Sequence, residues 1–272
     1  MPPSSIVPAS PGLVDQLCAI ARDAGAEVMS VYASPIAAAA KEDSSPVTEA
    51  DLRADRVIRA ALERLWPDIP VVSEESRPAR MPESFSLFFL VDPLDGTKEF
   101  IARSGEFTVN IALIHDGVAI AGVVSAPARG QMYHAAMGLG AYRTCNGATQ
   151  RIHVQPYTAR EPLRIVGSRS HGGERLASWV EALHVPLEFS AAGSSLKFCR
   201  IAEGAAHLYP RLGRTCHWDT AAAQCVLEQA GGRVTDLRGR TLRYEPRDGW
   251  FNADFIASCS EESLALCAAL RE

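Results

Sequence analysis

Apolar positions repeat at helical spacing near the start of the chain. After residues 1–9, which we interpret as a loose arm, Ser10-Pro11 begins a predicted helix that Pro35 ends. A second helix is predicted from about Thr48 to the residue before Trp66-Pro67. The apolar positions of the first are Leu13, Leu17, Ile20, Ala24, Val28 and Val31, and those of the second are Ile58, Ala61, Leu62 and Leu65.

Further along, the apolar pattern changes to short runs that are typical of strands. Two are predicted at 70–72 and 86–91, and an antiparallel meander follows at 107–114, 118–125 and 131–135. Beyond Pro156 strands and helices alternate. The predicted strands are 163–166, 206–209, 233–236 and 255–257, and the predicted helices are 173–183, 195–203, 220–230 and one from 260.

This change of pattern predicts two subdomains. Residues 1–156 form an α+β part with an antiparallel sheet, and residues 157–272 form an α/β part. With 272 residues, of which 47% are hydrophobic, the chain is long enough to bury a sizeable core.

Charge and cysteine content exclude several classes of protein. The formal charge is −5 and there is no basic tract, so the chain lacks the electrostatic pattern of a duplex nucleic-acid binder. Seven cysteines without a Cys-x-x-Cys pair argue against a disulfide framework and a structural zinc site. The same cysteine usage fits a reduced, cytoplasmic compartment. We also expect a soluble protein, because Met1–Ser5 do not resemble a signal peptide and no apolar run approaches the ~20 residues of a membrane span. Peripheral membrane contact stays open.

The most informative motif is Asp92-Pro93-Leu94-Asp95-Gly96-Thr97, directly after the apolar run 87–91. We expect the strand to end at this motif and a tight turn to bring its oxygens together, as in a metal site. An ordinary Pro-x-Asp-Gly turn is the alternative.

Three further acidic signals lie at the ends of predicted elements. They are Asp51, the pair Glu74-Glu75 after a short strand, and Asp219 at the start of a late helix. Singly, each has a structural explanation: a capping box with Thr48, a solvated turn and a helix cap. Together they indicate a hard oxygen site that favours magnesium, manganese or calcium, for which phosphate ester hydrolysis is the natural chemistry.

Two weaker signals point elsewhere. Gly138-Leu139-Gly140 begins like a dinucleotide fingerprint, but Arg143 replaces the third glycine, so we interpret these glycines as strand turns. Cys216 and His217 have no further Cys or His at ligand spacing and are interpreted as packing residues.

The acidic motifs resemble, in order and spacing, those of the lithium-sensitive, magnesium-dependent phosphatases related to inositol monophosphatase. The finer resemblance is to bacterial 3'(2'),5'-bisphosphate nucleotidases of sulfate assimilation. It rests on 45–48, 95–100, 105–110, 168–171, 193–198 and 209–211, which include Lys98-Glu99-Phe100 and Gly193-Ser194-Ser195-Leu196-Lys197-Phe198. This resemblance implies a layered α/β/α/β/α sandwich with the site between the two subdomains.

The resemblance also implies roles for individual residues. Glu74, Asp92 and the Leu94 carbonyl would hold one magnesium, and Asp92, Asp95 and Asp219 a second, in a site of two or three ions. The implied catalytic residues are Asp51, Glu74 and Thr97, which position or activate the attacking water. The implied substrate contacts are Leu94, Asp95, Gly96, Thr97, Ser170, His171, Ser194, Lys197, Arg211 and Asp219.

For three of these contacts a structural explanation stays open. Lys197 and Arg211 would pair with the distal phosphate, or would be solvated charges, and His171 would touch the nucleotide or lie beside a helix cap.

The leading hypothesis is a phosphatase that converts adenosine 3',5'-bisphosphate to AMP and phosphate, with phosphoadenosine phosphosulfate as a further substrate. Alternatives are inositol monophosphate or fructose bisphosphate as substrate at the same metals, and a non-catalytic nucleotide sensor. The expected partner is the small-molecule nucleotide, without nucleic acid, and the chain is expected to be a monomer or a homodimer.

Overall fold

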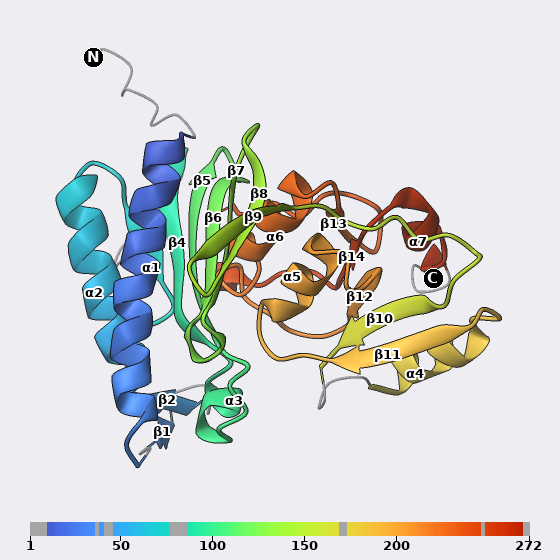
Figure 1. Cartoon of the computed structure of the whole chain (residues 1–272), viewed down its shortest axis with the longest axis horizontal. Coiled ribbons are helices and arrows are strands. Elements are labelled where there is room, and N and C mark those ends of the chain that lie inside the picture. The colour runs from blue at the N-terminus through green and yellow to red at the C-terminus, as the bar shows by residue number, and fades with distance from the viewer. Residues whose placement is uncertain are drawn as a thin grey trace.

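The computed structural model describes residues 10–35, 38–40, 46–76, 86–168, 173–245 and 248–268. The arm predicted at 1–9 lies outside them. Five layers follow one another: two long helices, a seven-stranded sheet, two central helices, a five-stranded sheet and two short helices (Figure 1). The layered α/β/α/β/α sandwich is therefore confirmed.

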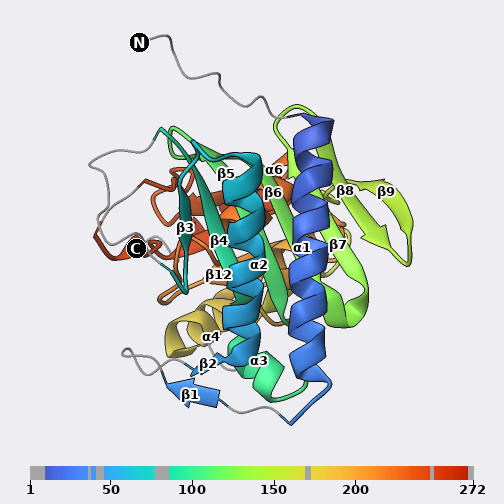
Figure 2. The same cartoon turned by 90° about the vertical axis from the view of Figure 1, so that its left-hand side faces the viewer.

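The first layer consists of α1 (Pro11–Tyr32) and α2 (Glu49–Leu65), and both predicted helices are confirmed. The Ser10 hydroxyl accepts a hydrogen bond from Leu13 N at 3.2 Å, which caps α1. The two helices lie side by side over one face of the larger sheet (Figure 2). Leu17 and Ile58 are fully buried there, because the apolar stripes face the sheet.

The seven-stranded sheet has the order β3-β4-β5-β6-β7-β8-β9. All neighbours are antiparallel except β3 and β4, so the meander is confirmed and a β8–β9 hairpin extends it. Positive φ angles at Gly138 and Gly140 confirm the strand turn expected there. The strands are β3 (Val71–Ser73), β4 (Leu87–Asp95), β5 (Thr108–His115), β6 (Val118–Ala126), β7 (Gln131–Ala136), β8 (Gly140–Cys145) and β9 (Ala148–Ile152).

The five-stranded sheet has the order β11-β10-β12-β14-β13. Its strands are β10 (Leu163–Gly167), β11 (Leu187–Ala191), β12 (Leu208–Arg211), β13 (Arg233–Asp236) and β14 (Phe255–Ser258). The edge strand β11 was not predicted. Its three middle residues are exposed, so it lacks the apolar alternation that reveals a half-buried strand.

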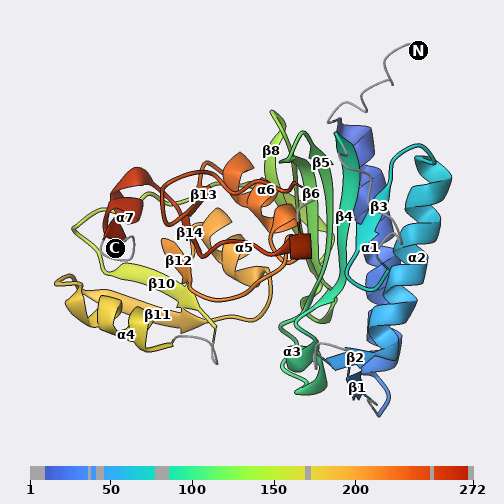
Figure 3. The ribbon, with the colours of Figure 1, turned by 180° about the vertical axis from the view of Figure 1, so that it is seen from behind.

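Helices α5 (Leu196–Ala202) and α6 (Ala221–Gln229) lie between the sheets, while α4 (Gly173–Ala182) and α7 (Glu261–Ala265) lie on the outer side (Figure 3). The smaller elements are β1 (Ala38–Ala40), β2 (Pro46–Thr48), α3 (Thr97–Ile101) and two 3₁₀ turns, Pro127–Arg129 and Asp248–Trp250. Within the described chain, no helix has both the length and the apolar character needed to cross a membrane.

Close packing of α6 on the larger sheet positions the site. A Cβ on Gly122 of β6 would lie 2.4 Å from the carbonyl oxygen of Ala222, so only glycine allows α6 to come this near. The start of α6 therefore lies against β6, two strands away from β4, which carries Asp92 and Asp95. The apolar core between the sheets draws on both sides of residue 156, and the division into two subdomains stays a prediction.

Candidate functional site

The Asp92–Thr97 motif does not leave the sheet where we expected. Strand β4 continues to Asp95, because its ladder with β5 is interrupted after Asp92 and resumes at Asp95. Pro93 within the interruption has no N–H to donate. The expectation that the strand ends at residue 91 is wrong, and the turn comes at Gly96, whose φ of 90° suits glycine.

Three carboxylates from separate elements converge beside this irregular strand. Glu74 follows β3, Asp92 lies in β4 and Asp219 precedes α6, and each offers an oxygen within 4.8 Å of the others. Glu74 is held at its backbone, where its N–H donates to Val91 O at 3.1 Å. Asp92 is held by its own turn, since its Oδ1 accepts from Leu94 N at 3.0 Å.

The Asp95 carboxylate interacts electrostatically with these three carboxylates. Burial raises the pKa of Asp92 well above its usual range, and the carboxylates of Glu74, Asp95 and Asp219 raise it further. Burial raises the pKa of Asp95 to about 6, although Lys197 and the Ser195 donors oppose the rise. Burial and the Asp95 carboxylate likewise raise the pKa of Asp219.

Such a cluster fits a divalent cation. Gathering buried carboxylates is unfavourable unless protons or a cation neutralise them. The donors are oxygens only, which Mg²⁺, Mn²⁺ and Ca²⁺ prefer over the nitrogen and sulfur ligands of zinc. The structure thus brings the predicted ligands Glu74, Asp92, Asp95 and Asp219 together, and their ligand roles stay predictions.

Ser195, at the start of α5, links Asp95 at the end of β4 to Asp219 before α6. Its N–H donates to Asp95 Oδ2 at 2.7 Å, and its hydroxyl donates to the backbone oxygen of Asp219 at 2.7 Å. Asp219 Oδ2 accepts from Cys216 N at 2.8 Å. The interpretation of Asp219 as a helix cap is wrong, because Thr220 is the N-cap of α6 and makes no side-chain cap bond.

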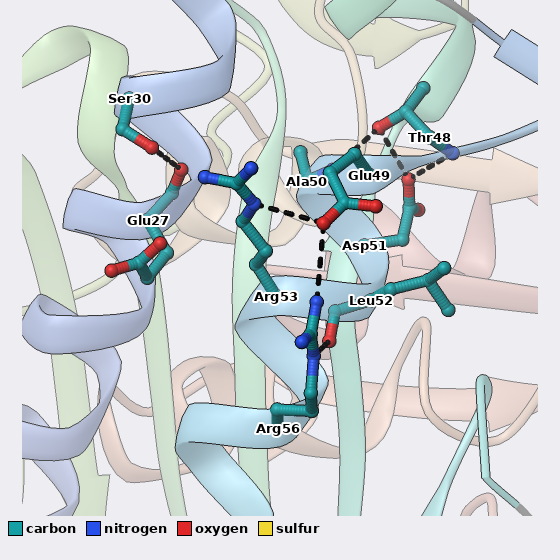
Figure 4. A network of polar contacts seen from close by, with 9 residues as sticks. All are labelled: Glu27, Ser30, Thr48, Glu49, Ala50, Asp51, Leu52, Arg53 and Arg56. Atoms are coloured by element: carbon teal, nitrogen blue, oxygen red, sulfur yellow. Dashed lines mark hydrogen bonds and ion pairs between the residues drawn. The ribbon is translucent and has the colours of Figure 1, made fainter.

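Asp51 makes two kinds of contact, a helix cap with Thr48, which Figure 4 shows, and a hydrogen bond with Thr97. Its Oδ2 accepts from both the backbone N–H and the hydroxyl of Thr48, each at 2.7 Å, which completes the capping box of α2. Its Oδ1 accepts from the Thr97 hydroxyl at 3.3 Å, and this hydroxyl also lies 3.3 Å from Leu94 O. The predicted catalytic pair Asp51 and Thr97 is therefore in contact.

A cavity of about 150 Å³ opens beside the carboxylates. Predicted site residues among its lining are Asp95, Gly96, Ser194, Lys197, Arg211 and Asp219. Leu94 and Thr97 lie next to the carboxylates but not in this lining. Ser170 and His171 lie outside the described residues, so their predicted contacts are not placed.

The two predicted cationic contacts differ in their surroundings. Lys197 is buried and its Nζ donates to Ser194 O at 2.7 Å, so the alternative of a solvated helix charge is wrong. Burial lowers the pKa of Lys197, whereas the Asp95 carboxylate opposes that change. Arg211 is half-buried and donates to Arg214 O at 3.2 Å, and its Nε has no hydrogen-bond partner within the described part of the chain.

Sequence reasoning missed several residues that organise this site. Ser195 is the clearest, and Asn110 supports it by donating to Ser195 Oγ at 3.0 Å. Tyr209 lies under the Lys197 ammonium, with 5.3 Å from Nζ to the ring centroid. A signal was available, because Asn110, Ser195 and Tyr209 all lie in the stretches that carry the family resemblance.

The sequence of this chain is similar to members of one known protein family. The profile of the inositol monophosphatase family matches residues 13–272. A curated relative from Salmonella typhimurium, named 3'(2'),5'-bisphosphate nucleotidase CysQ, is 48% identical over 246 residues, which is 89% of this chain and 98% of the relative. The same name belongs to a protein of Escherichia coli K12, which is 47% identical over 90% of this chain and 99% of that protein.

A solved structure supports the same grouping. The crystal structure of CysQ from Bacteroides thetaiotaomicron, described as a bacterial member of the inositol monophosphatase family, gives a TM-score of 0.77 at 33% identity. The match covers 91% of this chain and 97% of that one.

Proposed function

The chain belongs to the inositol monophosphatase family, and from this premise we propose that it is a 3'(2'),5'-bisphosphate nucleotidase. It removes the 3'-phosphate of adenosine 3',5'-bisphosphate and releases AMP and inorganic phosphate. The observation that carries the proposal is the carboxylate cluster beside a cavity that Lys197 and Arg211 line, in a chain 48% identical to a relative of that name. A substrate with two phosphates suits a site with both features.

The proposed cofactor is Mg²⁺, held by Glu74, Asp92, Asp95, Asp219 and the Leu94 carbonyl in a site of two or three ions. When bound, the ions would stabilise charge on the attacking and departing oxygens of an in-line displacement. Asp92 is the proposed bridge, because it is the most buried member of the cluster and its neighbours flank it from two other elements.

The chain's own residues orient the other reactants. The Thr97 hydroxyl lies between Asp51 and Leu94 O. There it can accept a proton from a water beside the cluster and pass its own proton to Asp51. Glu74 is the proposed further base. Gly96 and Thr97, where the chain leaves β4, are proposed to donate backbone N–H groups to the phosphate that is removed.

The second phosphate is proposed to bind in the cavity. Arg211 can present a guanidinium fork to it, while Lys197, held by Ser194 O, supplies a fixed positive charge. Ser194 is the proposed neutral contact, and Ser170 and His171 complete the proposed set.

We also propose phosphoadenosine phosphosulfate as a second substrate, a role in sulfate assimilation, and a location in the cytoplasm. The sequence expectation of a monomer or homodimer, built from subdomains 1–156 and 157–272, is kept as part of this proposal.

A substrate panel tests the proposal. Phosphate release is measured with Mg²⁺ on adenosine 3',5'-bisphosphate, inositol 1-phosphate and fructose 1,6-bisphosphate. The proposal expects the highest kcat/KM for the nucleotide. A higher value for inositol 1-phosphate or fructose 1,6-bisphosphate would favour the alternative substrates, and tight nucleotide binding without turnover would favour a sensor.

A further inference from the structure

Asp55 lies one helical turn beyond Asp51 on α2 and is 7% exposed. Both of its carboxylate oxygens accept hydrogen bonds from serines, one at the end of β3 and one three residues beyond it. Ser73 Oγ donates to Oδ1 at 2.5 Å, and Ser76 Oγ donates to Oδ2 at 2.7 Å. Glu74, a member of the acidic cluster, lies between these two serines. The Asp55 carboxylate therefore holds the segment that carries Glu74 against α2 at two points.

The other side of the segment is fixed to the sheet. Glu74 N–H donates to Val91 O at 3.1 Å, directly beside Asp92. Glu74 is thus held from β4 at its backbone and from α2 through its two flanking serines. With its backbone fixed in this way, Glu74 has only its side-chain torsions left to order when it binds a ligand.

Burial of Asp55 is unfavourable for folding alone. No lysine or arginine in the described ranges pairs with it, and hydroxyl donors compensate a buried carboxylate only in part. An apolar residue would pack at the same helix position without that penalty. Both hydrogen bonds of this carboxylate go to the segment that carries Glu74, so the carboxylate fixes where that segment lies relative to α2.

We propose that Asp55 is a positioning residue that sets the Glu74 carboxylate for divalent metal binding. The inference rests on the proposed function only in taking the acidic cluster as the metal site. Residues that hold metal ligands from outside the ligand set typically contribute 10–100-fold in metal affinity.

The test measures Mn²⁺ binding directly, by the electron paramagnetic resonance signal of the free ion, in the purified full-length chain. Ser76→Ala and Asp55→Ala are each expected to weaken Mn²⁺ binding by about 10-fold or more. Ser76→Thr keeps the hydroxyl and is expected to bind Mn²⁺ as the unaltered chain does. Glu63→Gln, on the exposed face of the same helix, is the control for a lost charge on α2.

Circular dichroism and the melting temperature, both measured without metal, show whether each variant folds. If Asp55→Ala does not fold, Ser76→Ala alone tests the proposal. Unchanged Mn²⁺ affinity in folded Ser76→Ala or Asp55→Ala would overturn it, even if their melting temperatures fall, because that pattern indicates a purely structural role. If the unaltered chain binds Mn²⁺ but does not hydrolyse adenosine 3',5'-bisphosphate, the proposed function fails. The Mn²⁺ affinities of the variants and the unaltered chain would still test the role of Asp55.

Discussion

Replacing Gly193 tests the contact between the chain after β11 and the chain before β5, which lies beside the site. Its N–H donates to Glu106 Oε2 at 3.0 Å, and Arg129 Nη2 holds the other carboxylate oxygen at 2.6 Å. A Cβ on Gly193 would lie 2.4 Å from the backbone oxygen of Glu106 and 2.8 Å from its Cβ. Glu106 is buried, so Gly193→Ala forces the 193–195 segment to move away from it.

The size of the effect follows from these contacts. Real Cβ atoms essentially never approach a heavy atom within 3.0 Å, so the segment must shift by more than half an ångström. Overpacking of this kind costs about 1–3 kcal/mol, and weakening the bond to the Glu106 carboxylate adds up to about 2 kcal/mol. Together these contributions predict a loss of unfolding free energy of about 1–5 kcal/mol.

The same shift reaches the carboxylates through Ser195, two residues along, which bonds Asp95 and Asp219. Displacements of about 1 Å at such a site reduce turnover by up to about 100-fold, so kcat/KM is expected to fall by at least about 10-fold.

Urea denaturation and phosphate release measure the two effects. Gly12→Ala is the matched control, because nothing lies within 4 Å of its added Cβ and the residue lies in the first turn of α1, far from the site. If Gly193→Ala matches the unaltered chain in both stability and turnover, the described packing of Gly193 on Glu106 is wrong.

Three further outcomes are expected. Burial raises the pKa of Glu228 to about 7, so the folded state holds a proton that the unfolded state has lost, and stability falls by at most about 3 kcal/mol as the pH rises from about 4.5 to 7. Glu228→Gln should reduce this dependence of stability on pH, measured by urea titrations across the same range. An unchanged dependence would contradict the assignment of this effect to Glu228. Asp92→Asn should raise the melting temperature without metal, by relieving repulsion, and abolish turnover; turnover left intact would refute the metal assignment. Millimolar lithium at limiting Mg²⁺ should inhibit phosphate release, because Li⁺ and Mg²⁺ are similar in size. Phosphate release that lithium does not affect would argue against competition at the metal site.

Much of the acidic cluster could be predicted because its signals are local. Glu74, Asp92, Asp95 and Asp219 each lie at the end or irregular point of a regular element, where side chains can converge without disturbing a ladder or helix. The capping box of Asp51 was equally visible, because its partner Thr48 is three residues away.

The parts that could not be predicted depend on distant contacts. The bond from Ser195 to Asp95 joins residues 100 positions apart, and burial of Lys197 depends on packing between two sheets. The continuation of β4 past Pro93 was missed because proline normally ends a strand, whereas here the ladder with β5 resumes at Asp95. The bridge from Asp55 to Ser73 and Ser76 has no local signature in the sequence at all.

The central claim is that the carboxylate cluster binds divalent metal and that the chain uses it to remove the 3'-phosphate of a nucleotide. It is tested most directly by following the products of adenosine 3',5'-bisphosphate with ³¹P nuclear magnetic resonance, with Mg²⁺ and with a chelator. The account predicts adenosine 5'-phosphate and inorganic phosphate in the presence of Mg²⁺, and intact substrate with the chelator. Turnover that persists in the chelator, or a product that keeps its 3'-phosphate, would contradict it.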